Sequence, residues 1–175
     1  MNLVGIDFEM ANAITGSLCA YGFAYEDGTW EQAVLRLHPK KGGEQERGRW
    51  HHISPAKTAA GNDPDALYSR LLALPADTVL VAHDAKIDQA QLYGWLDMWN
   101  LEPIHFPWFD TLRIARREFG KQGKLGIAAM AERMGMQVTP HKAGEDALVA
   151  LEIAKRYEWK DFYPMLDGKP VKMVS

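Results

Sequence analysis

Two acidic residues end the first apolar segment of the chain. In the segment GIDFEM, residues 5–10, Asp7 and Glu9 are two positions apart. Side chains of an extended strand alternate between its two faces, so both carboxylates lie on one face and their apolar neighbours on the other. Two carboxylates about 6.5 to 7 Å apart at the end of an apolar strand repel each other and lose hydration, and a bound cation is the simplest remedy. The alternative is an exposed strand end with both acids in water.

Two further acids, Asp88 and Asp146, fall on the apolar faces of expected helices. Asp88 shares its face with Ala85, Leu92, Trp95 and Leu96, and Asp146 with Val149, Ala150, Ile153 and Tyr157. An isolated buried carboxylate costs several kcal/mol or becomes protonated. A first-turn position, where the helix dipole favours an acid by about 0.3 to 1 kcal/mol, is the structural alternative. All four acids together predict one shared pocket.

His141 is the histidine that we associate with this pocket. It lies on a short loop, five residues before Asp146. Its reference pKa of about 6.5 suits a proton acceptor, whereas a solvated surface position is the alternative reading. His83 is expected to be a structural residue at a strand exit. The adjacent His51 and His52 lie on a turn and are not interpreted as metal ligands.

Three segments carry a family resemblance. GIDFEM at 5–10, VAHDAKIDQAQL at 81–92 and HKAGEDA at 141–147 resemble, in order and spacing, the three motifs of the DnaQ-like 3′–5′ exonucleases, in the branch called DEDDh. The stretch at 9–28 is also similar to bacterial and phage relatives of the DNA polymerase III epsilon subunit. The resemblance spans residues 2–157, most of the chain.

The resemblance implies a fold, a reaction and a set of roles. The fold would be α/β and RNase H-like, with a mixed sheet whose first three strands are antiparallel and whose later strands are parallel. The reaction would be hydrolysis of the terminal phosphodiester with two divalent cations, Mg²⁺ or Mn²⁺, which prefer hard oxygen ligands. The implied ligands are Asp7, Glu9, Asp88 and Asp146, with His141 as the general base. Met10, Ala11 and Asn12 would lie under the last nucleotide.

The chain departs from the family pattern at three positions. Asp84 replaces a common Asn and adds negative charge near the pocket, Ile87 replaces a common Phe as a conservative core change, and Met10 replaces a common Thr. None of these changes removes an implied ligand. DNA is the leading substrate, in proofreading or repair. Trimming of RNA ends is the close alternative, and a non-catalytic nucleic-acid-binding module is the alternative from another class.

Basic residues on the expected helix at 110–119 and in the polar loop after it offer one route to nucleic acid. These residues either follow phosphates or form a solvated helix face: Arg113, Arg116, Arg117, Lys121 and Lys124. The net charge of −3 shows no overall basic bias, so local charge must decide.

Length and composition indicate one globular domain. With 175 residues, 47% of them hydrophobic and 25% charged, we expect an exonuclease domain at 1–158 and a C-terminal tail at 159–175 that packs on it or extends from it. The single cysteine, Cys19, excludes an internal disulfide and suits a reducing, cytoplasmic setting. No apolar run reaches the roughly 20 residues of a membrane span, and no signal peptide is visible. A polymerase partner and a homodimer both stay open.

The expected elements follow from periodicity and turn residues. Strands are predicted at 2–9, 18–25, 29–37 and 78–82, with Asp27 and Gly28 in a hairpin turn between the second and third. A polar loop is predicted at 38–48 and a turn at 53–55. Helices are predicted from Asp63 or Pro64 to 73 and at 84–98, 110–119, 125–134 and 145–157, and the tail is expected to be irregular.

Overall fold

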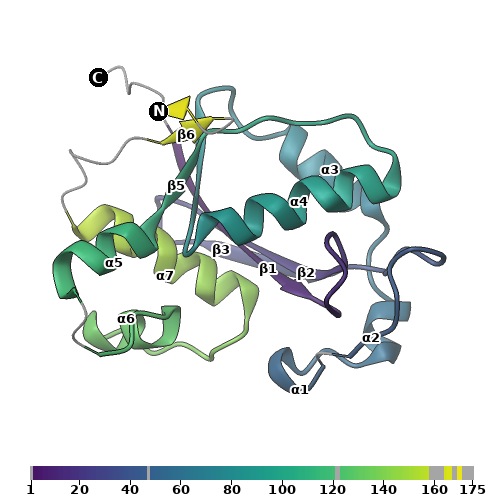
Figure 1. Ribbon diagram of the computed structural model, residues 1–175, viewed down its shortest axis with the longest axis horizontal. Coiled ribbons are helices and arrows are strands. Elements are labelled where there is room, and N and C mark those ends of the chain that lie inside the picture. Colours follow the sequence, from purple (N-terminus) through teal and green to yellow (C-terminus); the bar gives the residue numbers. More distant parts are fainter. Residues whose placement is uncertain (1, 47, 121–122, 158–163, 167–168, 171–175) are drawn as a thin grey trace.

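The computed structural model describes residues 2–46, 48–120, 123–157, 164–166 and 169–170, and within them seven strands form one sheet (Figure 1). The order across the sheet is β3-β2-β1-β4-β5-β6-β7. β1 (Asn2–Met10), β2 (Leu18–Ala24) and β3 (Trp30–Val34) are antiparallel, while β4 (Thr78–Ala82) and β5 (Trp108–Asp110) run parallel to β1. This arrangement confirms the predicted mixed sheet.

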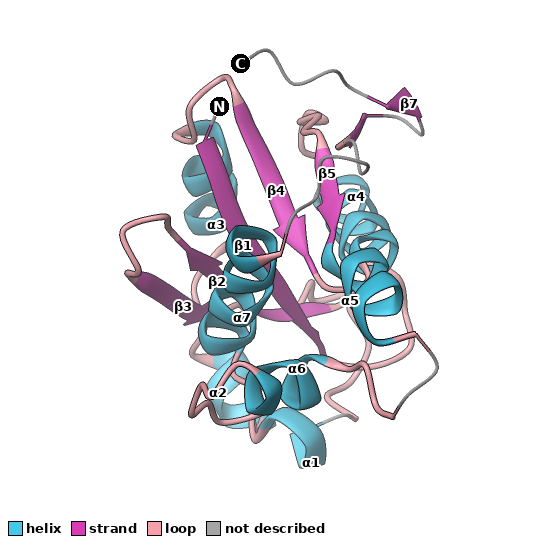
Figure 2. Ribbon diagram, turned by 90° about the vertical axis from the view of Figure 1, so that its left-hand side faces the viewer, coloured by secondary structure: helices cyan, strands magenta, loops and turns pink. Residues whose placement is uncertain are grey.

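Helices cover both faces of the sheet (Figure 2). α3 (Pro64–Leu72) and α4 (Ala85–Trp99) share one apolar core with the sheet, and α5 (Thr111–Phe119), α6 (Ile127–Arg133) and α7 (Ala143–Arg156) share a second core on the opposite face. Two short helices, α1 (Gly48–His51) and α2 (Pro55–Ala59), lie between β3 and α3. No helix among the described residues is long and apolar enough to cross a membrane.

Side-chain alternation along β1 assigns its two faces. Val4, Ile6 and Phe8 belong to the core under α3 and α4. Gly5 faces α7 so closely that a Cβ atom there would lie 2.3 Å from the carbonyl oxygen of Ala147. Because residues two apart share a face, the side chains that follow Gly5 at positions 7 and 9 also lie on the α7 side.

The predicted turn between β2 and β3 is confirmed, and cap residues begin α5 and follow α6. Tyr25 N donates to Thr29 O across the β2–β3 turn, and the Asp27 carboxylate accepts from Thr29 N at 2.9 Å. Asp110 caps α5, since its side chain accepts from Leu112 N. Gly135, with φ +70°, follows the end of α6 in the left-handed conformation that glycine adopts readily.

Several short elements differ from the prediction. β5 was not expected because its three residues are too few for periodicity to show, and no helix was expected where α1 and α2 follow the predicted loop at 38–48 and turn at 53–55. Within the tail, β6 (Met165–Leu166) pairs with β5, and β7 (Lys169–Pro170) pairs with β6. The domain boundary at 158 stays a prediction, and most of the tail lies outside the described residues.

Candidate active site

The carboxyl ends of β1 and β4 bring the first three acids together. β4 pairs with β1 in parallel and leads into α4 through Asp84, whose backbone N donates to Asp110 Oδ1 at 3.0 Å. Asp88, in the first turn of α4, accepts from the backbone N of Phe8 at 3.2 Å. Asp88 is therefore joined directly to β1 between Asp7 and Glu9.

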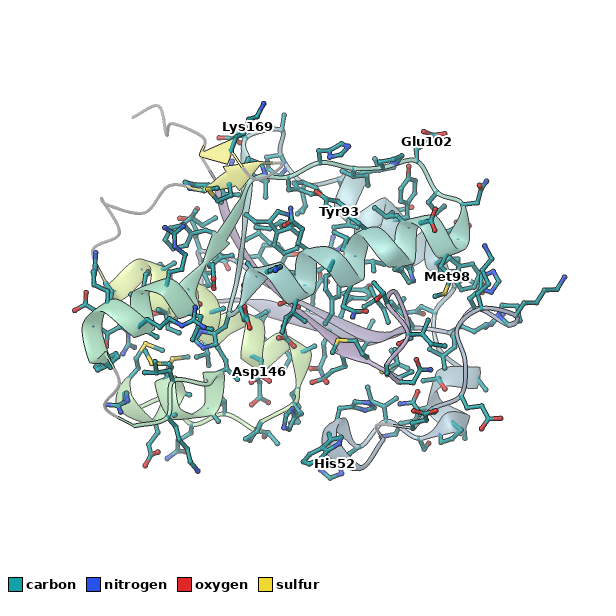
Figure 3. All side chains as sticks on the ribbon, in the orientation of Figure 1. His52, Tyr93, Met98, Glu102, Asp146 and Lys169 are labelled. Atoms are coloured by element: carbon teal, nitrogen blue, oxygen red, sulfur yellow. The ribbon has the colours of Figure 1, made fainter. Side chains whose placement is uncertain are left out.

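Glycines allow α7 to bring the fourth acid to the same place. A Cβ atom at Gly22 of β2 would lie 2.1 Å from the carbonyl carbon of Ala143, and one at Gly144 would lie 2.3 Å from the Trp30 ring. Gly144 N also donates to Gln32 Oε1 at 3.2 Å. These contacts seat the first turn of α7 on the sheet and bring Asp146, labelled in Figure 3, so near to β1 that its ligand atom lies within 4.8 Å of that of Glu9.

His141 stands at the edge of this cluster. Its side chain is exposed, and its backbone, with φ +63°, is left-handed. Its backbone N donates to Asp146 Oδ2 at 3.0 Å. Ligand atoms of Glu9, His141 and Asp146 all lie within 4.8 Å of one another, which is close enough to hold one metal ion.

Burial raises the pKa of the acids, and repulsion by other acids of the cluster adds to this for Asp7 and Glu9. Burial is the largest cause for Asp7, whose pKa lies well above its ordinary value, and the charges of Asp88, Asp146 and Glu9 raise it further. Burial followed by the charges of Asp146 and Asp88 raises the pKa of Glu9 to about 8. Burial likewise raises the pKa of Asp146 to about 6, against the hydrogen bond from His141 N. Without a cation, the cluster therefore holds protons near neutral pH.

The donor set fits hard divalent cations. Asp146 Oδ1 is buried and has no hydrogen-bond partner in the described part of the protein. Across those residues, no Lys or Arg side chain forms an ion pair with any of the four carboxylates. Carboxylate oxygens are the ligands that Mg²⁺ and Mn²⁺ prefer, and a cation would offset the burial and repulsion of the carboxylate charges that raise the pKa values.

The residues predicted to lie under the last nucleotide are mostly buried. Met10 is partly exposed, whereas Ala11 and Asn12 are buried. Asn12 Nδ2 donates to the carbonyl oxygens of Gly42 and Glu44, both at 2.8 Å. These two hydrogen bonds connect the 42–44 segment to the residues that follow β1. Substrate contact by these three residues stays a prediction.

Asp84 and Ile87 replace residues that are common in the family, and one of the two predictions made for them is wrong. Asp84 contributes its charge to the raised pKa of Asp88, after burial as the main cause, so the predicted negative charge near the pocket is confirmed. The prediction of Ile87 as a core residue is wrong, because its side chain is 49% exposed. Ile87 precedes Asp88 by one residue, and this step of about 100° around α4 turns it away from the buried face.

Three other histidines, which the sequence analysis considered, are one structural residue and two groove residues. His83 is a satisfied structural residue as predicted, with Nδ1 3.0 Å from Thr111 Oγ1 and Nε2 2.7 Å from Leu125 O. His51 and His52 line a groove of about 280 Å³ beside the acids. Its other polar lining includes Glu9, Gln32, Lys57 and His141. The sequence did not associate His51 and His52 with the pocket, since a turn far from the motifs gives no such signal.

The basic residues near α5 are exposed where the structure describes them. Arg113, Arg116, Arg117 and Lys124 are exposed, and Lys121 lies outside the described residues. Arg117 Nη2 lies 2.6 Å from Glu118 Oε1. Phosphate binding by this group stays a prediction.

Comparison with known proteins identifies a family. The exonuclease family model of the RNase T type matches residues 31–154, which include Asp88, His141 and Asp146 but not Asp7 and Glu9. No curated protein sequence matches the chain.

Solved structures with the same fold include three nucleases. Exonuclease X in complex with 5′ overhanging duplex DNA has 17% identity and a TM-score of 0.59, over 87% of this chain and 91% of that one. The nuclease domain of 3′hExo, described as a DEDDh family member bound to rAMP, has 16% identity and a TM-score of 0.66, over 89% and 90%. A 3′-exonuclease that recognises the histone mRNA stem-loop has 14% identity and a TM-score of 0.71, over 99% and 71%.

These findings bear out the family, but they do not test the resemblance to one of its members. The particular similarity to the epsilon subunit of DNA polymerase III stays a prediction. The match covers most of the chain, and the acids and histidine stand in the DEDDh order. The chain belongs to the RNase T family of exonucleases, in its DEDDh branch of 3′–5′ phosphodiester hydrolases.

Proposed function

We propose that this protein removes nucleoside monophosphates from the 3′ end of DNA with the help of two divalent cations, Mg²⁺ or Mn²⁺. One observation carries the proposal. Four carboxylates from β1, α4 and α7 converge, none of them in an ion pair with Lys or Arg among the described residues, and one of their buried oxygens, Asp146 Oδ1, has no partner there. Such a cluster suits cations that bind phosphate oxygens.

The four acids would hold the cations. Asp7 is central, because its pKa responds to the charges of all three other acids. Glu9 and Asp146 flank it on the side of His141, and Asp88 reaches it from α4. When bound, two cations stabilise the negative charge that develops on the attacking and leaving oxygens.

His141 would act as the general base. Its side chain is exposed at the mouth of the cluster, where it can accept a proton from the attacking water. A neutral imidazole has a ring nitrogen that can take up that proton. Catalysis by a positioned base of this kind typically contributes 10²- to 10⁴-fold, so His141 is expected to matter greatly for turnover.

The groove beside Glu9 and His141 would receive the end of the chain that is cut. Its lining offers Gln32, His52 and Lys57 for sugar, base or phosphate contacts. The resemblance of residues 9–28 to epsilon-subunit relatives favours DNA. Structures of the same fold hold duplex DNA in one case and recognise an mRNA stem-loop in another, so trimming of RNA ends is the second candidate.

A degradation assay tests the proposal. The full-length protein is incubated with 5′-labelled single-stranded DNA, duplex DNA and RNA of one sequence, with Mn²⁺, Mg²⁺ or EDTA. We expect a ladder of products shortened from the 3′ end, fastest on single-stranded DNA and abolished by EDTA. A blocked 3′ end is the control and should resist degradation. Binding without any cleavage would support a non-catalytic module instead, and faster laddering of RNA would assign the enzyme to RNA.

A further inference from the structure

We propose that Glu145 is a positioning residue that holds residues 139–142, the His141 loop, in the conformation that presents His141 to the acids. The inference rests on the proposed function, because it gives His141 a catalytic task. Glu145 lies in the first turn of α7, next to Asp146 but outside the set of implied ligands.

Two consecutive carboxylates hold the His141 loop from the helix side. Glu145 Oε2 accepts from Thr139 N at 2.5 Å, and Asp146 Oδ2 accepts from His141 N at 3.0 Å. Glu145 Oε1 also accepts from Lys142 Nζ at 3.1 Å. Lys142 is the N-cap residue of α7, yet its side chain makes no capping hydrogen bond. Glu145 therefore contacts both ends of the loop and ties it to the helix.

The His141 backbone needs such a restraint. Its φ of +63° is left-handed, and this conformation costs a residue with a Cβ atom roughly 1 kcal/mol or more. The strained conformation persists only where surrounding contacts hold it. Asp146 supplies one of those contacts, but its other oxygen belongs to the proposed cation site, so Glu145 is the carboxylate that is committed to the loop.

The helix end of this restraint is fixed to the sheet. Gly144 packs against the Trp30 ring and donates its backbone N to Gln32 Oε1 at 3.2 Å. Because the first turn of α7 cannot shift easily, the hydrogen bonds of Glu145 restrain the loop rather than the helix. Removal of its carboxylate should release Thr139 N and let His141 leave its position, while the four acids stay in place.

Substitutions at Glu145 have a matched control in the same helix. Glu152 also pairs with a lysine three residues away, Lys155 at 2.7 Å, and its side chain is 19% exposed compared with 15% for Glu145. We expect Glu145→Ala to lower kcat at least tenfold with KM changed less than twofold. Glu145→Gln keeps an oxygen that can accept from Thr139 N and should restore most of the lost rate. Glu152→Ala should leave both constants unchanged.

A double-mutant cycle tests whether Glu145 acts through His141. In a His141→Ala background, Glu145→Ala should change the remaining rate less than twofold, because the group that it positions is already gone. A full tenfold loss in that background would overturn the inference, because it would mean that Glu145 acts on the acids instead.

A second measurement is independent of catalysis. In the metal-free protein, amide hydrogen exchange followed by NMR should show Thr139 N exchanging at least tenfold faster in Glu145→Ala than in wild type, with the core amides of β1 unchanged. Equal exchange at Thr139 would overturn the inference even if the enzyme is active. Conversely, faster exchange in a protein without nuclease activity would leave the restraint in place and refute the proposed function alone.

Discussion

Asp146 divides its two carboxylate oxygens between two tasks. Oδ2 accepts from His141 N, and Oδ1 is buried without a partner among the described residues. A buried oxygen without a partner carries an unmet desolvation cost, which a cation would remove. Asp146 thus connects the loop of the proposed general base to the proposed cation site.

At the scale of single residues, the sharpest prediction concerns His141. His141→Ala should lower kcat by at least 100-fold, because a positioned general base contributes 10² to 10⁴. Its backbone N still donates to Asp146, so the acids should keep their arrangement and Mn²⁺ should bind with unchanged affinity. Single-turnover kinetics and calorimetric titration with Mn²⁺ measure the two effects.

The paired measurement makes this prediction specific. An equal loss of turnover and Mn²⁺ affinity would show that His141 serves as a ligand or a structural support. A wild-type rate would remove it from the reaction.

The sequence predicted the acids because their positions conflict with local rules. Asp7 and Glu9 share the strand face that contacts α7, and Asp88 and Asp146 occupy buried helix faces where apolar residues belong. Ile87 was misjudged, because one step around a helix separates a buried position from an exposed one. The roles of Asn12 and Glu145 depend on hydrogen bonds to loop backbone, which no periodic pattern encodes.

At the scale of elements, the contact between α7 and the sheet places the fourth acid. Gly5 and Gly22 present bare backbone to α7, and Gly144 presents the backbone of α7 to Trp30. No side chain separates the helix from the sheet at these points, so its first turn approaches the β1 acids closely. The geometry of the site therefore depends on residues that carry no chemistry themselves.

Substitution of one of these glycines should lower both the stability of the protein and its turnover. Gly22→Ala would place a Cβ atom 2.1 Å from Ala143 C, so α7 must move away. We expect a loss of about 1 to 3 kcal/mol in the free energy of unfolding, as for other overpacked positions, and a large loss of kcat because Asp146 moves with α7. Urea unfolding and the degradation assay measure both.

A second glycine supplies the control. A Cβ atom at Gly126 would meet nothing within 4 Å, and its backbone, with φ −66°, is ordinary for any residue. Gly126→Ala should change stability by less than about 1 kcal/mol and leave kcat unaltered. An unaffected rate in Gly22→Ala would contradict the dependence of Asp146 on this contact.

The elements that the sequence predicted are the ones with enough residues to show a period. The nine residues of β1 and the fifteen of α4 were anticipated within a few positions. β5 has three residues and β6 two, and neither length can display alternation. Their pairing is set by neighbours in the sheet, which local sequence does not reveal.

At the scale of the whole molecule, four clustered acids oppose folding when no cation is bound. Their pKa values are raised in the folded protein, to about 8 for Glu9 and about 6 for Asp146. A carboxyl group with a raised folded pKa contributes no penalty below its unfolded pKa near 4, and it becomes destabilising as pH rises towards the folded value. The metal-free protein should therefore lose stability between about pH 5 and pH 8.

The pH dependence should be visible in thermal unfolding with EDTA. We expect Tm to fall from pH 6 to pH 8. The fall reflects a loss in the free energy of unfolding of about 1.4 kcal/mol for each unit of pKa shift. Burial lowers the pKa of His83, and this group acts in the opposite sense, since it costs stability only as pH falls below its unfolded value of about 6.5. The fall above pH 6.5 is therefore assigned to the acids. Saturating Mn²⁺ should abolish it.

Replacement of the central acid tests this account. Asp7→Asn removes the carboxylate that the other three charges affect, so at pH 8 the metal-free variant should unfold at least about 4 °C above the wild type, or about 1 to 2 kcal/mol for a chain of this length. The same variant should gain little stability from Mn²⁺ and show no nuclease activity.

Asp77→Asn is the control, because the pKa of this exposed acid is lowered by hydrogen bonds and no member of the cluster touches it. Its Tm should not rise. A metal-free Asp7→Asn protein less stable than wild type at pH 8 would contradict this account, since burial of the Asp7 charge and its repulsion by the other acids both predict a gain when that charge is removed.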